Sequence, residues 1–180
     1  MTFSILGVLG HCKLYSDIDD KIDFETVSLN GVVKSIWGME LQMDRVIDNI
    51  NIDDYVALLI PGGFEEAGYY DELFSEQCQD LIKRFNNKNK YLISICVGSI
   101  SIAKTGILNG RNATTYNSDK RRGKLREYGA IIQNDKIVVD KNIISSNSPA
   151  TSIDVSFLTI ELLTSKDNSD KIKGLMGFDI

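Results

Sequence analysis

The chain has few of the residues that cross-link small folds through disulfide bonds or bind metal ions. It contains three cysteines and one histidine in 180 residues. Cys12, Cys78 and Cys96 lie far apart and form no Cys-x-x-Cys motif, so neither a disulfide framework nor a zinc site is predicted. We expect a reducing, cytoplasmic compartment, with no metal and no cofactor.

Long apolar runs and an excess of positive charge are also missing. No apolar run reaches the roughly 20 residues that cross a membrane, and Met1–Gly10 lacks the positive start of a signal peptide. The net charge is −5, whereas nucleic-acid binding needs clustered Lys and Arg. The one dense basic cluster, Lys120-Arg121-Arg122, is expected to be a solvated helix face. We therefore predict neither nucleic acid nor a membrane as a partner.

Strand and helix patterns alternate along the chain. A length of 180 residues suits one domain, which we place at 1–180. Apolar runs predict buried strands at 55–60 and 91–95, and residues 143–146 are expected to form a final strand. Patterns typical of helices lie at 70–85, 118–128 and 152–163. This order predicts an α/β fold with a mostly parallel sheet covered on both faces. Ligands of such folds bind at the carboxyl ends of the strands.

Shorter patterns predict pairing at the edges. Residues 24–29 are strand-like and end at Asn30-Gly31, a turn signal that predicts pairing back by residues 32–37. The segments 131–132 and 137–139 are expected to form a hairpin or meander.

Cys96 is the strongest functional candidate. It lies between the apolar run 91–95 and a helix-like pattern that Val97 and Gly98 open. This places its sulfur beside free N–H groups and the positive end of a helix dipole, which favour the reactive thiolate. Pro61-Gly62-Gly63 follows the strand at 55–60, where glycine lets the backbone approach a ligand closely.

Four segments together resemble the DJ-1/PfpI (ThiJ) family, and in motif most closely its branch of isocyanide hydratases and amidotransferase-like domains. They are residues 59–63 (LIPGG), 95–99 (ICVGS), 103–116 (AKTGILNGRNATTY) and 144–154 (ISSNSPATSID). The resemblance implies a flavodoxin-like three-layer sandwich related to class I glutamine amidotransferases. It also implies that Cys96 is the elbow nucleophile and that the N–H groups of Gly63 and Val97 form an oxyanion hole. Ser148 and Pro149 would line the pocket.

Several positions depart from the family pattern. Val97 stands where the protease branch has a histidine, and Tyr116 stands where many DJ-1-like members have one. The single histidine, His11, lies near the N-terminus, so a cysteine–histidine dyad is disfavoured. Tyr116 would either donate a hydrogen bond into the pocket or pack over the sheet. Glu65, with its neighbour Glu66, would either replace the family's acidic residue or face water.

The N-terminal segment allows two alignments. Family members begin with a strand, followed by a helix whose acidic residue bonds the nucleophile's sulfur. In the preferred alignment residues 5–15 are that helix, Ser4 takes the acid's position in the pocket, and the opening strand is missing. In the alternative, residues 3–9 form the strand and 10–20 a shortened helix.

The sequence leaves the function open between classes. The first hypothesis is a hydratase or hydrolase whose Cys96 forms a thio-adduct with a small neutral or cationic substrate. The alternative is a non-catalytic, redox-responsive or small-molecule-binding module that uses the same cysteine. Protease- or amidotransferase-type hydrolysis ranks lower because no base accompanies Cys96. The resemblance also implies that the chain forms a homodimer.

Overall fold

The computed structural model describes residues 2–14 and 22–178. Its contacts divide the chain into two compact units, Glu25–Ser148 and the combination of Met1–Phe24 with Pro149–Ile180. Across the described ranges, every helix is too short or too polar to cross a membrane.

A four-stranded sheet organises the unit Glu25–Ser148. Its order is β5 (Ala57–Ile60), β6 (Tyr91–Ser94), β10 (Ile143–Ser146) and β9 (Ile137–Asp140). The first three strands run parallel, and β9 is antiparallel to β10. Parallel pairing sets Ile60 opposite Ser94, so the two loops with the predicted site residues leave the same edge. The three strands and their parallel arrangement are confirmed, and burial is confirmed for β6 and β10, whereas β5 is fully buried only at Ile60.

The two predicted hairpins, of residues 24–29 with 32–37 and of 131–132 with 137–139, are wrong, because these strands pair with other partners. β9 pairs with β10 through the tight turn at Lys141, whose φ is 56°, while β8 (Ile131–Ile132) pairs in parallel with β7 (Asn112–Ala113). Nearer the N-terminus, two further two-stranded sheets form: β2 (Val32–Lys34) pairs forward with β3 (Glu40–Gln42), and β1 (Val27–Ser28) pairs with β4 (Arg45–Val46). The hairpins β2–β3 and β9–β10 are local but lie one strand later than predicted. The pairs β1–β4 and β7–β8 join strands that are separate in sequence, so local turn signals do not determine them.

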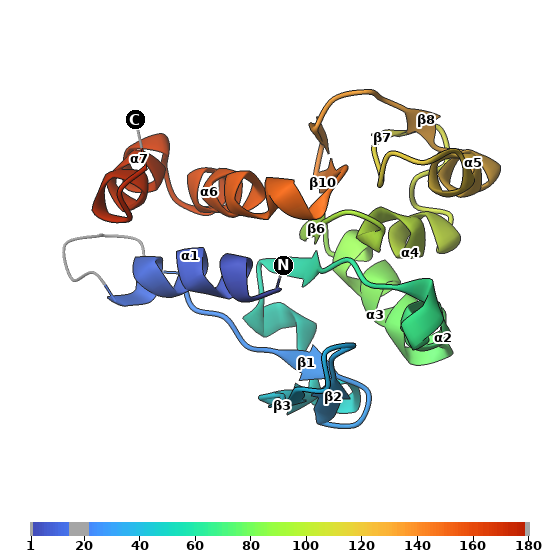
Figure 1. The fold of residues 1–180 in the computed structure, drawn as a ribbon, viewed down its shortest axis with the longest axis horizontal. Helices are drawn as coiled ribbons and strands as arrows, with labels where there is room; N and C mark the ends of the chain where they lie inside the picture. The colour runs from blue at the N-terminus through green and yellow to red at the C-terminus, as the bar shows by residue number, and fades with distance from the viewer. Residues whose placement is uncertain (1, 15–21, 179–180) are drawn as a thin grey trace. The chain divides into compact units, whose positions relative to one another are not determined.

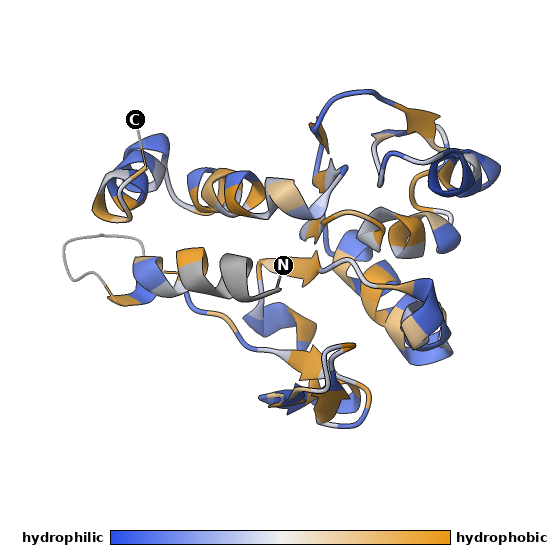
Figure 2. Ribbon diagram, viewed as in Figure 1, coloured by the Kyte–Doolittle hydropathy of each residue, from blue (hydrophilic) through white to orange (hydrophobic). Residues whose placement is uncertain are grey.

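Helices α3 (Glu76–Asn87) and α4 (Gly98–Lys104) pack on β6, and α2 (Tyr69–Leu73) precedes α3. The single helix predicted over 70–85 is therefore two, because the Ser75 side chain caps α3 by accepting the Cys78 N–H. Helix α5 (Asp119–Glu127) is largely hydrophilic (Figure 2), and the chain turns away from it at Gly129, whose φ is 85°. The 3-10 turns lie at Ile47–Asn49, Ile52–Asp54, Glu65–Ala67 and Pro149–Thr151.

The other unit is helical (Figure 1). Helix α1 (Thr2–Leu14) packs against α6 (Ser152–Leu163), which packs against α7 (Lys166–Leu175). The helix expected over residues 5–15 is confirmed for its described part, and the alternative strand at 3–9 is wrong; residues 15–20 lie outside the described ranges. The helix at 152–163 is confirmed as predicted.

Candidate active site

Cys96 occupies a strained turn between a buried strand and a helix. β6 ends at Ser94 and α4 begins at Gly98, and Cys96 itself has a φ of 58°. A left-handed backbone costs a residue other than glycine about 1–2 kcal/mol. The turn is held from outside, because the Cys96 carbonyl accepts a hydrogen bond from Thr115 Oγ1 at 3.1 Å and one from Ser99 Oγ at 3.5 Å.

This strain makes a testable prediction about stability. Because glycine adopts positive φ without penalty, Cys96→Gly should be more stable than Cys96→Ala by about 1 kcal/mol. Urea unfolding followed by circular dichroism measures the difference. Cys78, within helix α3, is the matched control, since there alanine should exceed glycine by about 1 kcal/mol. The same order at both positions would contradict a strained Cys96.

Gly98 brings the neighbouring loop close to this turn. A Cβ placed on Gly98 would lie 2.6 Å from the Ile60 carbonyl oxygen and 3.2 Å from that of Pro61. The Ile60 oxygen is fixed in turn by the Ile95 N–H at 3.1 Å. Only glycine therefore lets the start of α4 meet the end of β5, which places the Pro61-Gly62-Gly63 loop beside the cysteine turn.

An aromatic ring covers Gly63. A Cβ on Gly63 would lie 2.0 Å from Cδ2 of Tyr69, and the Tyr69 hydroxyl donates to the Pro61 carbonyl. Burial, and less strongly the nearby Tyr70 and Cys96, hold the pKa of Tyr69 well above its ordinary value, so this hydroxyl stays a donor. Among the described residues, the Gly63 N–H has no acceptor. It thus remains available to a ligand.

The environment of the Cys96 thiol differs from the expectation. The residue is 7% exposed, and burial raises the pKa of its thiol. The Val97 N–H, which hydrogen-bonds the sulfur, and the Arg121 guanidinium both lower the pKa, but burial outweighs them. The predicted preference for thiolate is therefore wrong, because the short helix does not offset the loss of water around the sulfur.

Arg121 lies in the site, whereas the sequence predicts it on a solvated face. Its side chain is 18% exposed, its Nη1 lies 2.9 Å from Glu65 Oε2, and its guanidinium lies 5.4 Å from the centroid of the Tyr70 ring. Burial raises the pKa of Tyr70 to about 12. The Tyr70 ring contacts the Tyr69 ring edge-on at 5.2 Å. A continuous line of contacts thus connects Arg121 with Gly63. In the sequence, only the basic run Lys120-Arg121-Arg122 draws attention to Arg121.

Glu65 and Glu66 are both exposed to solvent. Glu65 Oε2 pairs with Lys120 at 2.7 Å as well as with Arg121, and hydrogen bonds from these two cations lower its pKa. Neither carboxylate is among the groups that shift the Cys96 pKa. Tyr116 is 45% exposed and its hydroxyl has no partner among the described residues, so a role in the pocket stays a prediction for it.

The remaining predicted residues are divided between the units. Ser148 ends the unit that contains Cys96, whereas Pro149 opens the 3-10 turn of the helical unit. Ser4 and His11 lie on α1, in the helical unit. Their roles beside Cys96 stay predictions.

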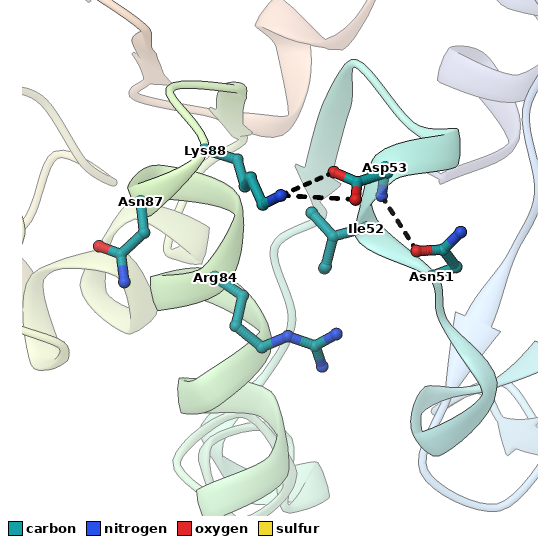
Figure 3. A pocket seen from close by; sticks show the side chains of 6 residues that line it. All are labelled: Asn51, Ile52, Asp53, Arg84, Asn87 and Lys88. Atoms are coloured by element: carbon teal, nitrogen blue, oxygen red, sulfur yellow. Dashed lines mark hydrogen bonds and ion pairs between the residues drawn. The ribbon is translucent and has the colours of Figure 1, made fainter.

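Figure 3 shows a pocket of about 250 Å³ that does not include Cys96. It is lined by Asn51, Ile52, Asp53, Arg84, Asn87 and Lys88. These residues precede the amino ends of β5 and β6, and Lys88 already pairs with Asp53 at 3.0 Å. Over the described ranges, no three His, Cys, Asp or Glu side chains gather in a way that would hold a metal ion.

Comparison with known sequences finds one family. A model of the DJ-1/PfpI family matches residues 14–162. An uncharacterized protein of Methanocaldococcus jannaschii is 33% identical over 129 residues, which are 72% of this chain and 62% of that protein. An isonitrile hydratase of Pseudomonas putida is 26% identical over 141 residues, or 78% of this chain and 59% of that enzyme. The chain thus spans less than two thirds of the length of these relatives.

Comparison with solved structures gives the fold. The crystal structure of Drosophila melanogaster DJ-1beta superposes with a TM-score of 0.82 at 22% identity, covering 99% of this chain and 91% of that one. With its mostly parallel sheet and packed helices, the chain has the predicted flavodoxin-like α/β fold.

Proposed function

The chain belongs to the DJ-1/PfpI family, and we propose that it is an enzyme whose Cys96 adds covalently to a small electrophile in hydratase- or hydrolase-type chemistry. The left-handed backbone of Cys96, with φ at 58°, carries this proposal. A nucleophile elbow holds its reactive side chain at a strained turn between strand and helix. The isonitrile hydratase relative supports the reaction class, since an isonitrile carbon is open to attack by a thiolate.

The neighbouring backbone supports the chemistry. With a carbonyl substrate, the thiol proton passes to water, the sulfur bonds to the carbon, and the π electron pair moves onto oxygen. The N–H groups of Gly63 and Val97 are the proposed donors to that oxyanion. The raised pKa of Cys96 leaves little thiolate at neutral pH, but a thiolate of high pKa is the stronger nucleophile once formed.

One observation also favours the redox alternative. The positive charge of Arg121 acts on Cys96, and it would stabilise a sulfenate or sulfinate anion as it stabilises a thiolate. In that function, peroxide would transfer oxygen to the sulfur and leave as water, and no substrate would be turned over.

A single comparison separates the two functions. The protein is incubated with an isonitrile, with an α-oxoaldehyde, and with hydrogen peroxide, and product and intact protein mass are followed in each. Turnover with recovery of the free thiol is expected. A gain in protein mass from oxygen added to Cys96 by peroxide, without turnover of either electrophile, would overturn the enzymatic function and favour the redox alternative. A small-molecule substrate, a homodimer and a cytoplasmic location are parts of the same proposal.

A further inference from the structure

Arg121 presents two hydrogen-bond donors that no described residue uses. Its hydrogen-bonding partners, Glu65 Oε2 and the Tyr70 hydroxyl, both lie on Nη1. Among the described residues, Nε and Nη2 have no partner. No side-chain nitrogen in the described part of the chain is both fully buried and unpartnered, so these two donors reach solvent. Nε and Nη2 form one edge of the guanidinium, and such an edge matches the two oxygens of a carboxylate.

The surroundings of that edge add to its attraction for an anion. Lys120 and Arg121 share one carboxylate, Glu65, so two positive charges against one negative charge leave one positive charge. The Tyr70 hydroxyl accepts from Arg121 at 3.4 Å, and its own proton has no acceptor among the described residues. Tyr70 therefore offers a third donor next to Arg121, on the Nη1 side of the guanidinium.

Contacts connect Arg121 with the Gly63 loop, and the positive charge of Arg121 also acts on the Cys96 sulfur. The Arg121 guanidinium stacks on Tyr70, the Tyr70 ring contacts Tyr69, and the Tyr69 ring covers Gly63. We propose that Arg121 and Tyr70 form a carboxylate-binding subsite beside Cys96, so that the preferred substrate is an electrophile that carries a carboxylate, such as an α-oxoacid. The inference rests on the proposed function, because it names the substrate class of the same site. It replaces the neutral or cationic substrate expected from the sequence.

A pair of alkylating reagents tests the subsite without knowledge of the natural substrate. Iodoacetate and iodoacetamide present the same reacting carbon, and only iodoacetate carries a carboxylate. With either reagent the Cys96 thiolate bonds to that carbon, iodide leaves, and the thiol proton has gone to water. Both reagents consume the same thiolate, so the ratio of their rate constants cancels any change in the Cys96 pKa.

The ratio of iodoacetate to iodoacetamide rate constants at Cys96 should fall about tenfold in Arg121→Gln, the effect of one charged hydrogen-bonding partner. Arg122→Gln is the matched control, because Arg122 is the next residue on α5 and bonds Asn117 and Asn134. That variant should leave the ratio unchanged. Glu65→Gln keeps the guanidinium and removes its competing carboxylate, so it should raise the ratio even where Arg121→Gln folds poorly.

The outcomes separate this inference from the function on which it rests. A ratio that neither Arg121→Gln nor Glu65→Gln changes would overturn the carboxylate subsite and leave Cys96 as the nucleophile. A Cys96 that neither reagent modifies in the folded protein, although urea exposes it to both, would overturn the proposed function and the subsite together.

Discussion

Replacing Cys96 by serine should lower the rate of product formation at least about a thousandfold with whichever electrophile the protein turns over. Serine keeps the size of the side chain and its place in the turn. Its hydroxyl is a far weaker nucleophile than a thiolate unless a base removes its proton. In the described part of the chain, no histidine or carboxylate is among the groups that shift the pKa of Cys96. Steady-state rates of the two proteins measure the effect.

Cys78→Ser is the control for this prediction. Cys78 is a half-buried free cysteine on helix α3, and its replacement should leave the rate within about twofold, as is usual for a site outside the chemistry. Equal losses in the two variants would point to damaged folding rather than to a missing nucleophile. Full activity in Cys96→Ser would contradict the proposed function.

Gly98→Ala should lower the free energy of unfolding by about 1–3 kcal/mol, the usual cost of an overpacked position. The added methyl group would lie 2.6 Å from the Ile60 carbonyl oxygen. That oxygen cannot retreat easily, because it holds the Ile95 N–H between β5 and β6. Urea unfolding followed by circular dichroism gives the free energy.

Gly123→Ala provides the contrast within the same fold. Gly123 lies in helix α5, and a Cβ placed on it would have nothing within 4 Å, so alanine there should stabilise the chain by up to about 1 kcal/mol through helix propensity. Opposite signs for the two substitutions are the expected result. If Gly98→Ala also stabilised the protein, the close approach of α4 to β5 would be refuted.

The parts of the fold that were predictable are those with a local cause. Strand β5 is a continuous apolar run, and β6 and β10 begin with short apolar runs; such runs indicate buried parallel strands. The placement of Cys96 followed from the same pattern, since it stands where the strand ends and the helix begins. The side chain of Ser75, by contrast, interrupts a helical periodicity that the apolar residues continue.

The parts that were not predictable depend on contacts between distant segments. The burial of Arg121 requires Tyr70, 51 residues away, and nothing in the basic run around Arg121 indicates that partner. The same holds for the Cys96 pKa. The sequence correctly predicts a helix start next to the sulfur, but the burial that raises the pKa comes from packing of the whole unit.

The pH dependence of Cys96 alkylation by iodoacetamide tests the central claim most directly. Cys96 should be modified in the folded protein, and its rate should rise with pH to a midpoint above the value of about 8.5 for a free cysteine, because burial raises its pKa. Arg121→Gln should move the midpoint higher still, since Arg121 favours the thiolate. Peptide mass spectrometry reads Cys96 separately from Cys12 and Cys78. A Cys96 that stays unmodified at every pH at which the protein is folded, while Cys78 reacts, would contradict the assignment of Cys96 as the nucleophile.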